Sequence, residues 1–118
     1  MKQEYVIYHN PRCSKSRATK ALLESKGIEV EVIQYLKVPL NSESLMQLLE
    51  KLNLTAAGLI RTGESAFKKS GIDLTIASEA SLIELMVKDP ILIERPIVET
   101  DQSARIGRPP EKVLELFR

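Results

Sequence analysis

The chain has 118 residues, of which 43% are hydrophobic and 28% are charged, and its formal net charge is +1. This length and apolar content suit one domain with a single core. A net charge near zero argues against a nucleic-acid binder that works by overall basicity, although a few arginines can still form a small basic pocket. With one cysteine and one histidine, the sequence has too few ligands for a four-ligand Cys/His zinc site and cannot form an internal disulfide.

Signals for export or membrane insertion are not found in the sequence. No segment near the N-terminus combines basic residues, an apolar stretch and a small-residue cleavage site. No apolar run approaches the ~18 residues of a membrane span. Because a single thiol fits a reducing compartment, we expect a cytoplasmic protein that binds neither membrane nor nucleic acid. No heptad pattern calls for a partner helix, so a monomer is expected.

The first third of the chain predicts a strand, a helix and a second strand. Residues 5–8 are a short apolar run that stops at His9-Asn10-Pro11, as a buried strand does when it ends in a turn. Good helix formers occupy residues 14–26, and Gly27 supplies the C-terminal stop. Residues 29–35 predict a second strand, parallel to the first in a βαβ unit. The apolar face of the helix is expected at Ala18, Ala21 and Leu22.

The middle of the chain, about residues 42–88, predicts a helical insert. Leucines from Leu45 to Leu52 keep the spacing of one helix face. A short helix is expected to carry Leu59, Ile60 and Arg61, and another turn or two over residues 65–70 stops at Gly71. A last helix of the insert carries residues 82–86 and ends before Pro90. The expected N-caps are Ser42, Thr55 and Ser78.

The last part of the chain returns to strands and ends in a helix. Residues 91–93 lead into an extended segment over residues 95–98, and residues 104–106 are expected to pair with it as a hairpin. Pro109-Pro110 then opens a helix through residue 117, since proline suits a first helical turn. The order is βαβ, a helical insert and ββα, which without the insert is the thioredoxin-type order. Periodicity predicts an α/β domain but leaves its topology open.

The predicted chemistry centres on the turn between the first strand and the first helix, residues 9–17. This turn lies at the carboxyl end of the strand, the edge at which open α/β sheets bind ligands. The N–H groups of a first helical turn hold an anion and favour thiolate over thiol, here at Cys13. Positive charge favours the thiolate too, and hydroxyls are expected to hydrogen-bond the sulfur or a bound oxyanion. The basic residues are Arg12, Lys15 and Arg17, and the hydroxyls belong to Ser14 and Ser16.

Cys13 and His9 also have structural interpretations. A lone cysteine is often a small buried hydrophobe. The polar and basic neighbours of Cys13, and its place at a strand-to-helix turn, favour a nucleophile instead. His9 either caps the end of the strand or lies close enough to tune the cysteine, and its position slightly favours tuning.

The segment His9-Asn10-Pro11-x-Cys13-x-x-Ser16-Arg17 resembles the active-site signature of the glutaredoxin-linked arsenate reductase family. The resemblance extends over the whole chain, because Arg61, Arg95-Pro96 and Arg108 stand in segments that match three further motifs of the family in order and spacing. Longer members continue past the position of Arg118, so the chain resembles a short-chain branch of the family.

The resemblance implies a single domain over residues 1–118 with a thioredoxin-like fold, the helical insert and a cis peptide between Arg95 and Pro96. It implies that Cys13 is catalytic, that no metal or cofactor is bound, and that three arginines bind the substrate. Arginine suits an oxyanion because its planar, permanently charged guanidinium donates two parallel hydrogen bonds, although any one arginine alone would be read as a surface residue. The substrate-binding residues are Arg61, Arg95 and Arg108, and the supporting residues are His9, Asn10, Ser16, Arg17 and Pro96.

The expected reaction is attack of the Cys13 thiolate on the arsenic of arsenate, with loss of hydroxide and formation of a covalent adduct. Reduction of As(V) to As(III) takes two electrons, and no second cysteine is present, so another thiol must come from outside. The resemblance names glutathione as the reducing co-substrate and glutaredoxin as the partner that resolves the mixed disulfide. Some family members have a cysteine near the third arginine, whereas this chain has Gly107.

The sequence alone leaves other functions open. A glutaredoxin-like thiol transferase acting on mixed disulfides also needs an activated lone cysteine, but it has no need of three arginines. A regulator that binds RNA polymerase, of the kind related to this family, carries Cys-x-x-Cys, whereas Ser16 stands at the fourth position here. Arsenate, phosphate and sulfate are all tetrahedral anions, and nothing in the sequence ranks them.

Overall fold

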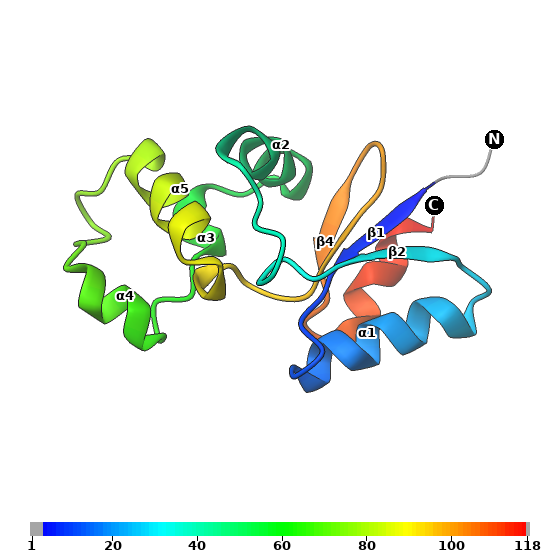
Figure 1. The fold of residues 1–118 in the computed structure, drawn as a ribbon. Coiled ribbons are helices and arrows are strands. Elements are labelled where there is room, and N and C mark those ends of the chain that lie inside the picture. Colours follow the sequence, from blue (N-terminus) through cyan, green and yellow to red (C-terminus); the bar gives the residue numbers. More distant parts are fainter. Residues whose placement is uncertain (1–3, 118) are drawn as a thin grey trace. The chain divides into compact units, whose positions relative to one another are not determined.

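A computed structural model describes residues 4–117 and divides the chain into two compact units (Figure 1). The sheet unit combines the chain up to Val38 with the chain from Arg95 onward. The helical unit is the intervening segment, Pro39–Glu94. The two ends of the chain therefore build the sheet, while the middle folds as helices.

In its described residues, the sheet unit contains four strands in the spatial order β2-β1-β3-β4. Strand β1 lies in the middle, parallel to β2 and antiparallel to β3, which in turn pairs antiparallel with β4. The predicted mixed sheet, βαβ unit and hairpin are confirmed. The strands are β1 (Tyr5–Tyr8), β2 (Val30–Ile33), β3 (Ile97–Glu99) and β4 (Ala104–Ile106).

Two helices of the sheet unit pack against the sheet and against each other: α1 (Ser14–Ser25) and η2 (Pro110–Leu116). Their shared core joins Ile7 and Val98, which are register partners in β1 and β3, to Leu23 of α1 and Val113 and Leu116 of η2. Burying an aliphatic side chain of this size contributes about 1.5–3 kcal/mol. The cluster therefore fixes α1, and the turn before it, against the sheet. The expected last helix is present as a 3₁₀ helix.

The buried face of α1 differs from the expected one. The buried residues are Ser16, Thr19 and Leu23, while Ala18 and Ala21 are exposed and Leu22 is half-buried. The expected face was wrong for the alanines because local hydrogen bonds allow hydroxyls to be buried there. The Thr19 Oγ1 group, for example, donates to the carbonyl of Lys15 at 2.8 Å. The stop at Gly27 is confirmed by its φ of 77°.

The helical unit contains four α-helices and one 3₁₀ turn. Helices α2 and α3 pack against α5, and the turn η1 packs against α4 and α5. Leu45, Leu48, Leu59 and Met86 are among its buried side chains, each at most 1% exposed. The elements are α2 (Ser42–Leu52), α3 (Ala56–Leu59), α4 (Ser65–Ser70), α5 (Glu79–Lys88) and η1 (Pro90–Leu92).

Two helix starts in this unit test the capping predictions. The N-cap of α2 is Asn41, whose Oδ1 accepts from the Ser44 N–H at 2.7 Å, so the prediction of Ser42 is wrong by one residue. Asparagine caps as well as serine does, and Ser42 becomes the first helical residue. Ser78 is confirmed as the N-cap of α5, where its hydroxyl accepts from the Ser81 N–H at 3.1 Å.

The segment around Arg61 is not helical as expected. Thr55 is the N-cap residue of α3, but its side chain makes no cap hydrogen bond. The helix ends at Leu59, and Ile60 instead forms an isolated antiparallel bridge with Ile93. Residues 90–92, before the expected extended segment, form a 3₁₀ turn. The backbone pairing of Ile60 with Ile93 has thus overridden the local helical pattern.

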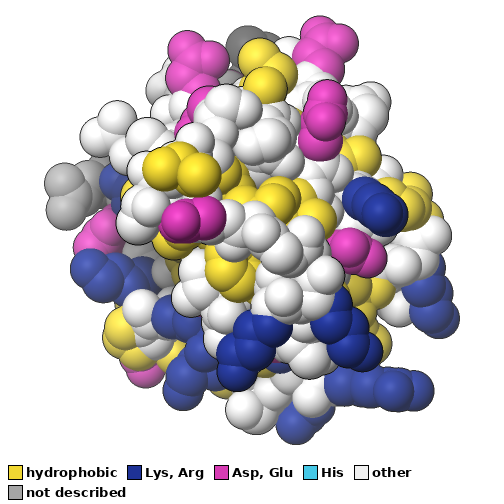
Figure 2. Space-filling model, turned by 90° about the vertical axis from the view of Figure 1, so that its left-hand side faces the viewer, with side chains coloured by type: hydrophobic (Ala, Val, Ile, Leu, Met, Phe, Trp, Pro, Cys, Tyr) yellow, Lys and Arg dark blue, Asp and Glu magenta, His cyan; other side chains and the backbone are white. Residues whose placement is uncertain are grey.

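Charged side chains and small groups of hydrophobic ones share the face drawn in Figure 2. Among large apolar side chains of the described residues, the most exposed are Ile76 at 82% and Val38 at 64%. Such isolated residues are normal on a protein surface. Within residues 4–117, no helix combines the length and the apolar character that a membrane span requires.

Candidate active site

Cys13 is the N-cap residue of α1, as the sequence predicts. Its backbone is extended, its N–H donates to the Asn10 carbonyl at 2.9 Å, and its carbonyl accepts from the Arg17 N–H at 3.0 Å. Its side chain makes no capping bond, so the first-turn N–H groups keep their capacity to hold an anion. The thiol is buried, with 9% of the residue exposed.

A buried hydroxyl organises the turn that carries Cys13. The Ser16 Oγ lies 2.6 Å from the His9 Nδ1 and accepts from the Asn10 N–H at 3.0 Å. Ser16 is 0% exposed, and His9 and Asn10 are also buried. Ser16 thus joins two residues of the turn, and the expectation that its hydroxyl bonds the sulfur or the oxyanion stays a prediction. Asn10 continues the network, since its Oδ1 accepts from the Arg12 N–H at 3.0 Å.

His9 sits where the strand ends and the turn begins. Its N–H donates to the Ile33 carbonyl at 2.8 Å and extends the pairing of β1 with β2, so it does cap the strand. Burial, and then the positive charges of Lys20 and Arg17, hold the pKa of His9 below its usual range. A neutral ring can accept from the Ser16 hydroxyl at Nδ1, while that hydroxyl accepts from Asn10. Tuning of Cys13 by His9 stays a prediction.

Arg17 closes the turn on its exposed side. Its Nη1 donates to the Pro11 carbonyl at 2.8 Å. The supporting residues predicted in this segment, His9, Asn10, Ser16 and Arg17, thus lie in one hydrogen-bonded turn around Cys13. Their shared effect is to hold the backbone that positions the thiol.

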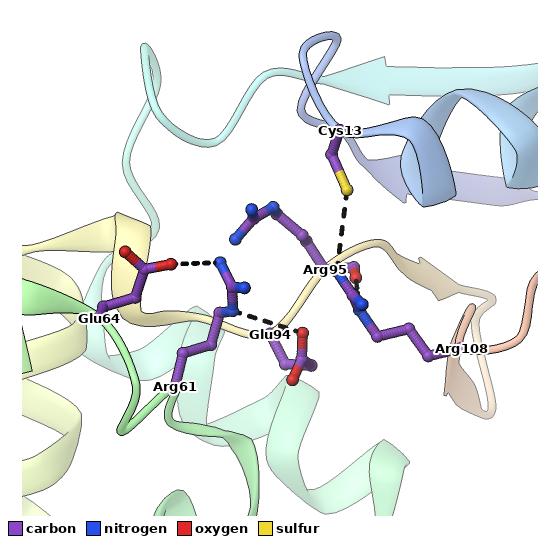
Figure 3. A network of polar contacts seen from close by, with 6 residues as sticks. All are labelled: Cys13, Arg61, Glu64, Glu94, Arg95 and Arg108. Carbon is purple, nitrogen blue, oxygen red and sulfur yellow. Dashed lines mark hydrogen bonds and ion pairs between the residues drawn. The ribbon is translucent and has the colours of Figure 1, made fainter.

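Arg108 brings a guanidinium to the sulfur from the far end of the chain (Figure 3). Its Nε donates to the Arg95 carbonyl at 2.7 Å, and its Nη2 lies 3.8 Å from the Cys13 Sγ. The cis peptide implied between Arg95 and Pro96 is present, and Arg108-Pro109 is a second cis peptide that was not expected. The Nε and Nη1 atoms of Arg95 are buried. The sheet unit therefore brings Cys13, Arg108 and the Arg95 backbone together.

Gly107 has a structural role that sequence reasoning missed. Its N–H donates to the Pro96 carbonyl at 2.9 Å. A Cβ atom at this position would lie 2.5 Å from the Thr19 Oγ1 and 3.0 Å from the Pro96 Cγ. The absence of a side chain lets this loop approach α1 closely, one residue before Arg108. The sequence around Gly107, a Gly-Arg pair followed by proline, gives no signal of its close approach to Thr19.

Arg61, the third predicted substrate ligand, belongs to the helical unit and is engaged there by two carboxylates (Figure 3). Its Nη1 lies 2.7 Å from the Glu64 Oε1, and its Nε lies 3.6 Å from the Glu94 Oε1. Its N–H donates to the Leu92 carbonyl at 2.7 Å. These glutamates were not singled out from the sequence, although Glu64 has the i,i+3 spacing of an ion pair. Substrate binding by Arg61 stays a prediction.

Among residues 4–117, no three His, Cys, Asp or Glu side chains group as metal ligands do. The chemistry of the turn comes from a thiol, a guanidinium and backbone N–H groups. That set can bind an oxyanion and attack it with sulfur.

Comparisons with known proteins agree with this arrangement. The sequence matches the ArsC family over residues 8–116. It is 47% identical over 117 residues to the uncharacterized protein YfgD of Escherichia coli K12, covering 98% of each chain. It is 42% identical over 113 residues to the arsenate reductase of Haemophilus influenzae, covering 95% of this chain and 97% of that protein. The solved arsenate reductase from Vibrio cholerae matches with a TM-score of 0.93 and 44% identity over 98% of both chains, which confirms the thioredoxin-like α/β fold.

Proposed function

Because the chain belongs to the ArsC family, we propose that it is an oxidoreductase that reduces arsenate to arsenite through Cys13. The observation that carries the proposal is the Arg108 guanidinium, 3.8 Å from the thiol of the residue at the N-cap position of α1. Relatives similar over nearly their whole length, such as the Haemophilus influenzae protein, are arsenate reductases by name, which supports the choice of anion.

In the first step, the Cys13 thiolate attacks arsenic and forms an S–As bond. An As–O bond breaks with its electron pair on oxygen, and the oxygen leaves as hydroxide, which the buffered solvent neutralises. Arg108 stabilises the thiolate before the attack and the arsenate oxygens during it, and the first-turn N–H groups of α1 add donors. Arg95 and Arg61 are proposed as further ligands of the arsenate.

In the second step, an external thiol completes the two-electron reduction. Glutathione sulfur forms a disulfide with the Cys13 sulfur, and the electron pair of the S–As bond stays with arsenic, which leaves as As(III). A glutaredoxin thiolate then attacks the mixed disulfide, accepts the glutathione and releases Cys13 as a thiolate. An external donor is needed because Cys13 is the only cysteine in the sequence.

The proposal is tested by arsenate-dependent oxidation of NADPH with glutathione, glutathione reductase and glutaredoxin. The wild type should turn over, and Cys13→Ser should show no turnover above the assay without enzyme, since serine at neutral pH offers no comparable nucleophile. Turnover that survives in Cys13→Ser would overturn the mechanism. A wild type that reduces a small mixed disulfide but not arsenate would instead establish a thiol transferase.

A further inference from the structure

Three exposed basic side chains stand close in the sequence to the buried thiol, and we propose that they dock a carboxylate-bearing thiol reductant. This cationic rim consists of Arg12, Lys15 and Arg17, all exposed, within four positions of the buried Cys13. The inference rests on the proposed reduction by an external thiol. It adds that the protein recognises the carboxylates of that reductant.

The electrostatic setting of the rim differs from that of Lys20 and Arg105, two other basic residues of the sheet unit. Lys20 lies 2.9 Å from Glu24, and Arg105 lies 2.8 Å from Glu115. Within residues 4–117, by contrast, no carboxylate forms an ion pair with a side chain of the rim. The charges next to the thiol are thus left to interact with solvent and with incoming molecules.

The turn fixes the backbone of Arg12 and one end of the Arg17 side chain. The Arg12 N–H is fixed by the Asn10 Oδ1 at 3.0 Å, and one nitrogen of Arg17 is fixed by the Pro11 carbonyl at 2.8 Å. The remaining guanidinium nitrogens and the Lys15 ammonium are available donors. Since exposed charges act over a Debye length of about 8 Å at physiological salt, the rim acts on a molecule whose sulfur approaches Cys13.

The chemistry of the second step selects an anionic partner. A thiol that bears carboxylates can place them on the rim while its sulfur reaches the Cys13 sulfur. A neutral thiol gains nothing from the rim, and a cationic thiol is repelled. The overall net charge is only +1, so this preference arises from the local arrangement rather than from the whole protein.

The test uses thiol–disulfide exchange, which needs no arsenate. The Cys13 thiolate attacks a symmetrical disulfide, one S–S bond to Cys13 forms as the original S–S bond breaks, and one thiolate leaves. Rate constants are measured at pH 7 with oxidised glutathione, which carries carboxylates, with neutral hydroxyethyl disulfide and with cationic cystamine. A change in thiolate content alters all three rates together, so the ratio of the rates isolates docking.

The variant is Arg12→Ser/Lys15→Gln, and the matched control is Lys26→Gln, an exposed lysine at the other end of α1. We expect the rate for oxidised glutathione relative to the neutral disulfide to fall about three- to tenfold in the double variant, and not in the control. High salt should lower the same ratio in the wild type.

Each result bears on a different claim. An unchanged ratio in the double variant, with a normal rate for the neutral disulfide, overturns the rim while leaving the proposed function in place. A wild-type Cys13 that reacts with none of the three disulfides overturns both. Reaction with the disulfides but no reduction of arsenate overturns the arsenate step alone and retains the rim for a thiol transferase.

Discussion

Two arginines predicted for the same task are held differently by the two units. Arg108, in the sheet unit, is oriented by the Arg95 carbonyl and reaches the Cys13 sulfur. Arg61, in the helical unit, is held by the carboxylates of Glu64 and Glu94. A carbonyl directs a guanidinium without cancelling its charge, whereas a carboxylate both directs and neutralises it.

The difference suggests different behaviour when an anion binds. An oxyanion can interact with Arg108 while the bond to the Arg95 carbonyl persists. An anion that binds Arg61 competes with carboxylates for the same nitrogens. We therefore expect Arg108 to dominate reactivity at the thiol and Arg61 to adjust affinity.

The largest effect is expected from Arg108→Ala. Removing a donor aimed at the thiolate and the reacting anion should lower kcat/KM for arsenate about 100-fold. Steady-state kinetics measures the change. Arg105→Ala is the control, because Arg105 of β4 pairs with Glu115 of η2 at 2.8 Å, and this variant should remain within twofold of the wild type. Equal losses in both variants would refute a special role for Arg108.

Gly107→Ala tests the packing that carries Arg108. A Cβ 2.5 Å from the Thr19 Oγ1 should lower the free energy of unfolding by about 1–3 kcal/mol, measured by urea denaturation. Adding Thr19→Ala should restore part of the loss. In the helical unit, Gly63 has no atom within 4 Å of such a Cβ, so Gly63→Ala should leave the stability nearly unchanged. A stable Gly107→Ala protein would contradict the close packing.

Glu64→Gln tests whether a carboxylate competes with the anion for Arg61. Loss of a carboxylate 2.7 Å from the guanidinium should lower KM for arsenate about two- to fivefold with little change in kcat. Steady-state kinetics separates the two constants. Arg61→Ala should raise KM, and if it leaves KM unchanged, Arg61 is not a ligand and the gain from Glu64→Gln is not expected either.

The smallest effect is expected from the titration of His9, the only histidine of the chain. Its pKa is lowered in the folded protein, chiefly by burial, so the unfolded chain binds the proton more readily. The contribution to stability is present above the unfolded pKa of about 6.5 and is lost as the pH falls through the folded pKa. Urea midpoints at pH 7.5 and 5.5 should differ more in the wild type than in His9→Gln; equal differences would exclude His9 as the titrating group.

Local sequence signals predicted the part of the site that is local. Cys13 could be placed at a helix start because an apolar run, a turn and a stretch of helix formers follow one another directly. The buried face of α1 could not be predicted in this way. Apolar spacing does not show that Ser16 and Thr19 bury hydroxyls that are hydrogen-bonded within the turn and the helix.

Contacts between distant segments account for what was missed. The approach of Gly107 to Thr19 joins residues 88 positions apart, and no local pattern encodes it. Glu64 could have been found from its spacing to Arg61, but Glu94 could not. The resemblance supplied Arg95, Pro96 and Arg108 as a set, while the carbonyl that orients Arg108 required the structure.

The Ser16 hydroxyl also constrains how the chain can change. Conversion to a two-thiol enzyme by Ser16→Cys would replace the oxygen that lies 2.6 Å from His9 and accepts from Asn10. Sulfur is larger and a weaker hydrogen-bond partner, so the new thiol would weaken the hydrogen bonds that hold the turn around Cys13. Because the turn needs the serine oxygen at position 16, the second thiol must come from a reductant that diffuses to the site. The proposed catalytic cycle then contains a bimolecular step, and its rate follows the concentration of that reductant.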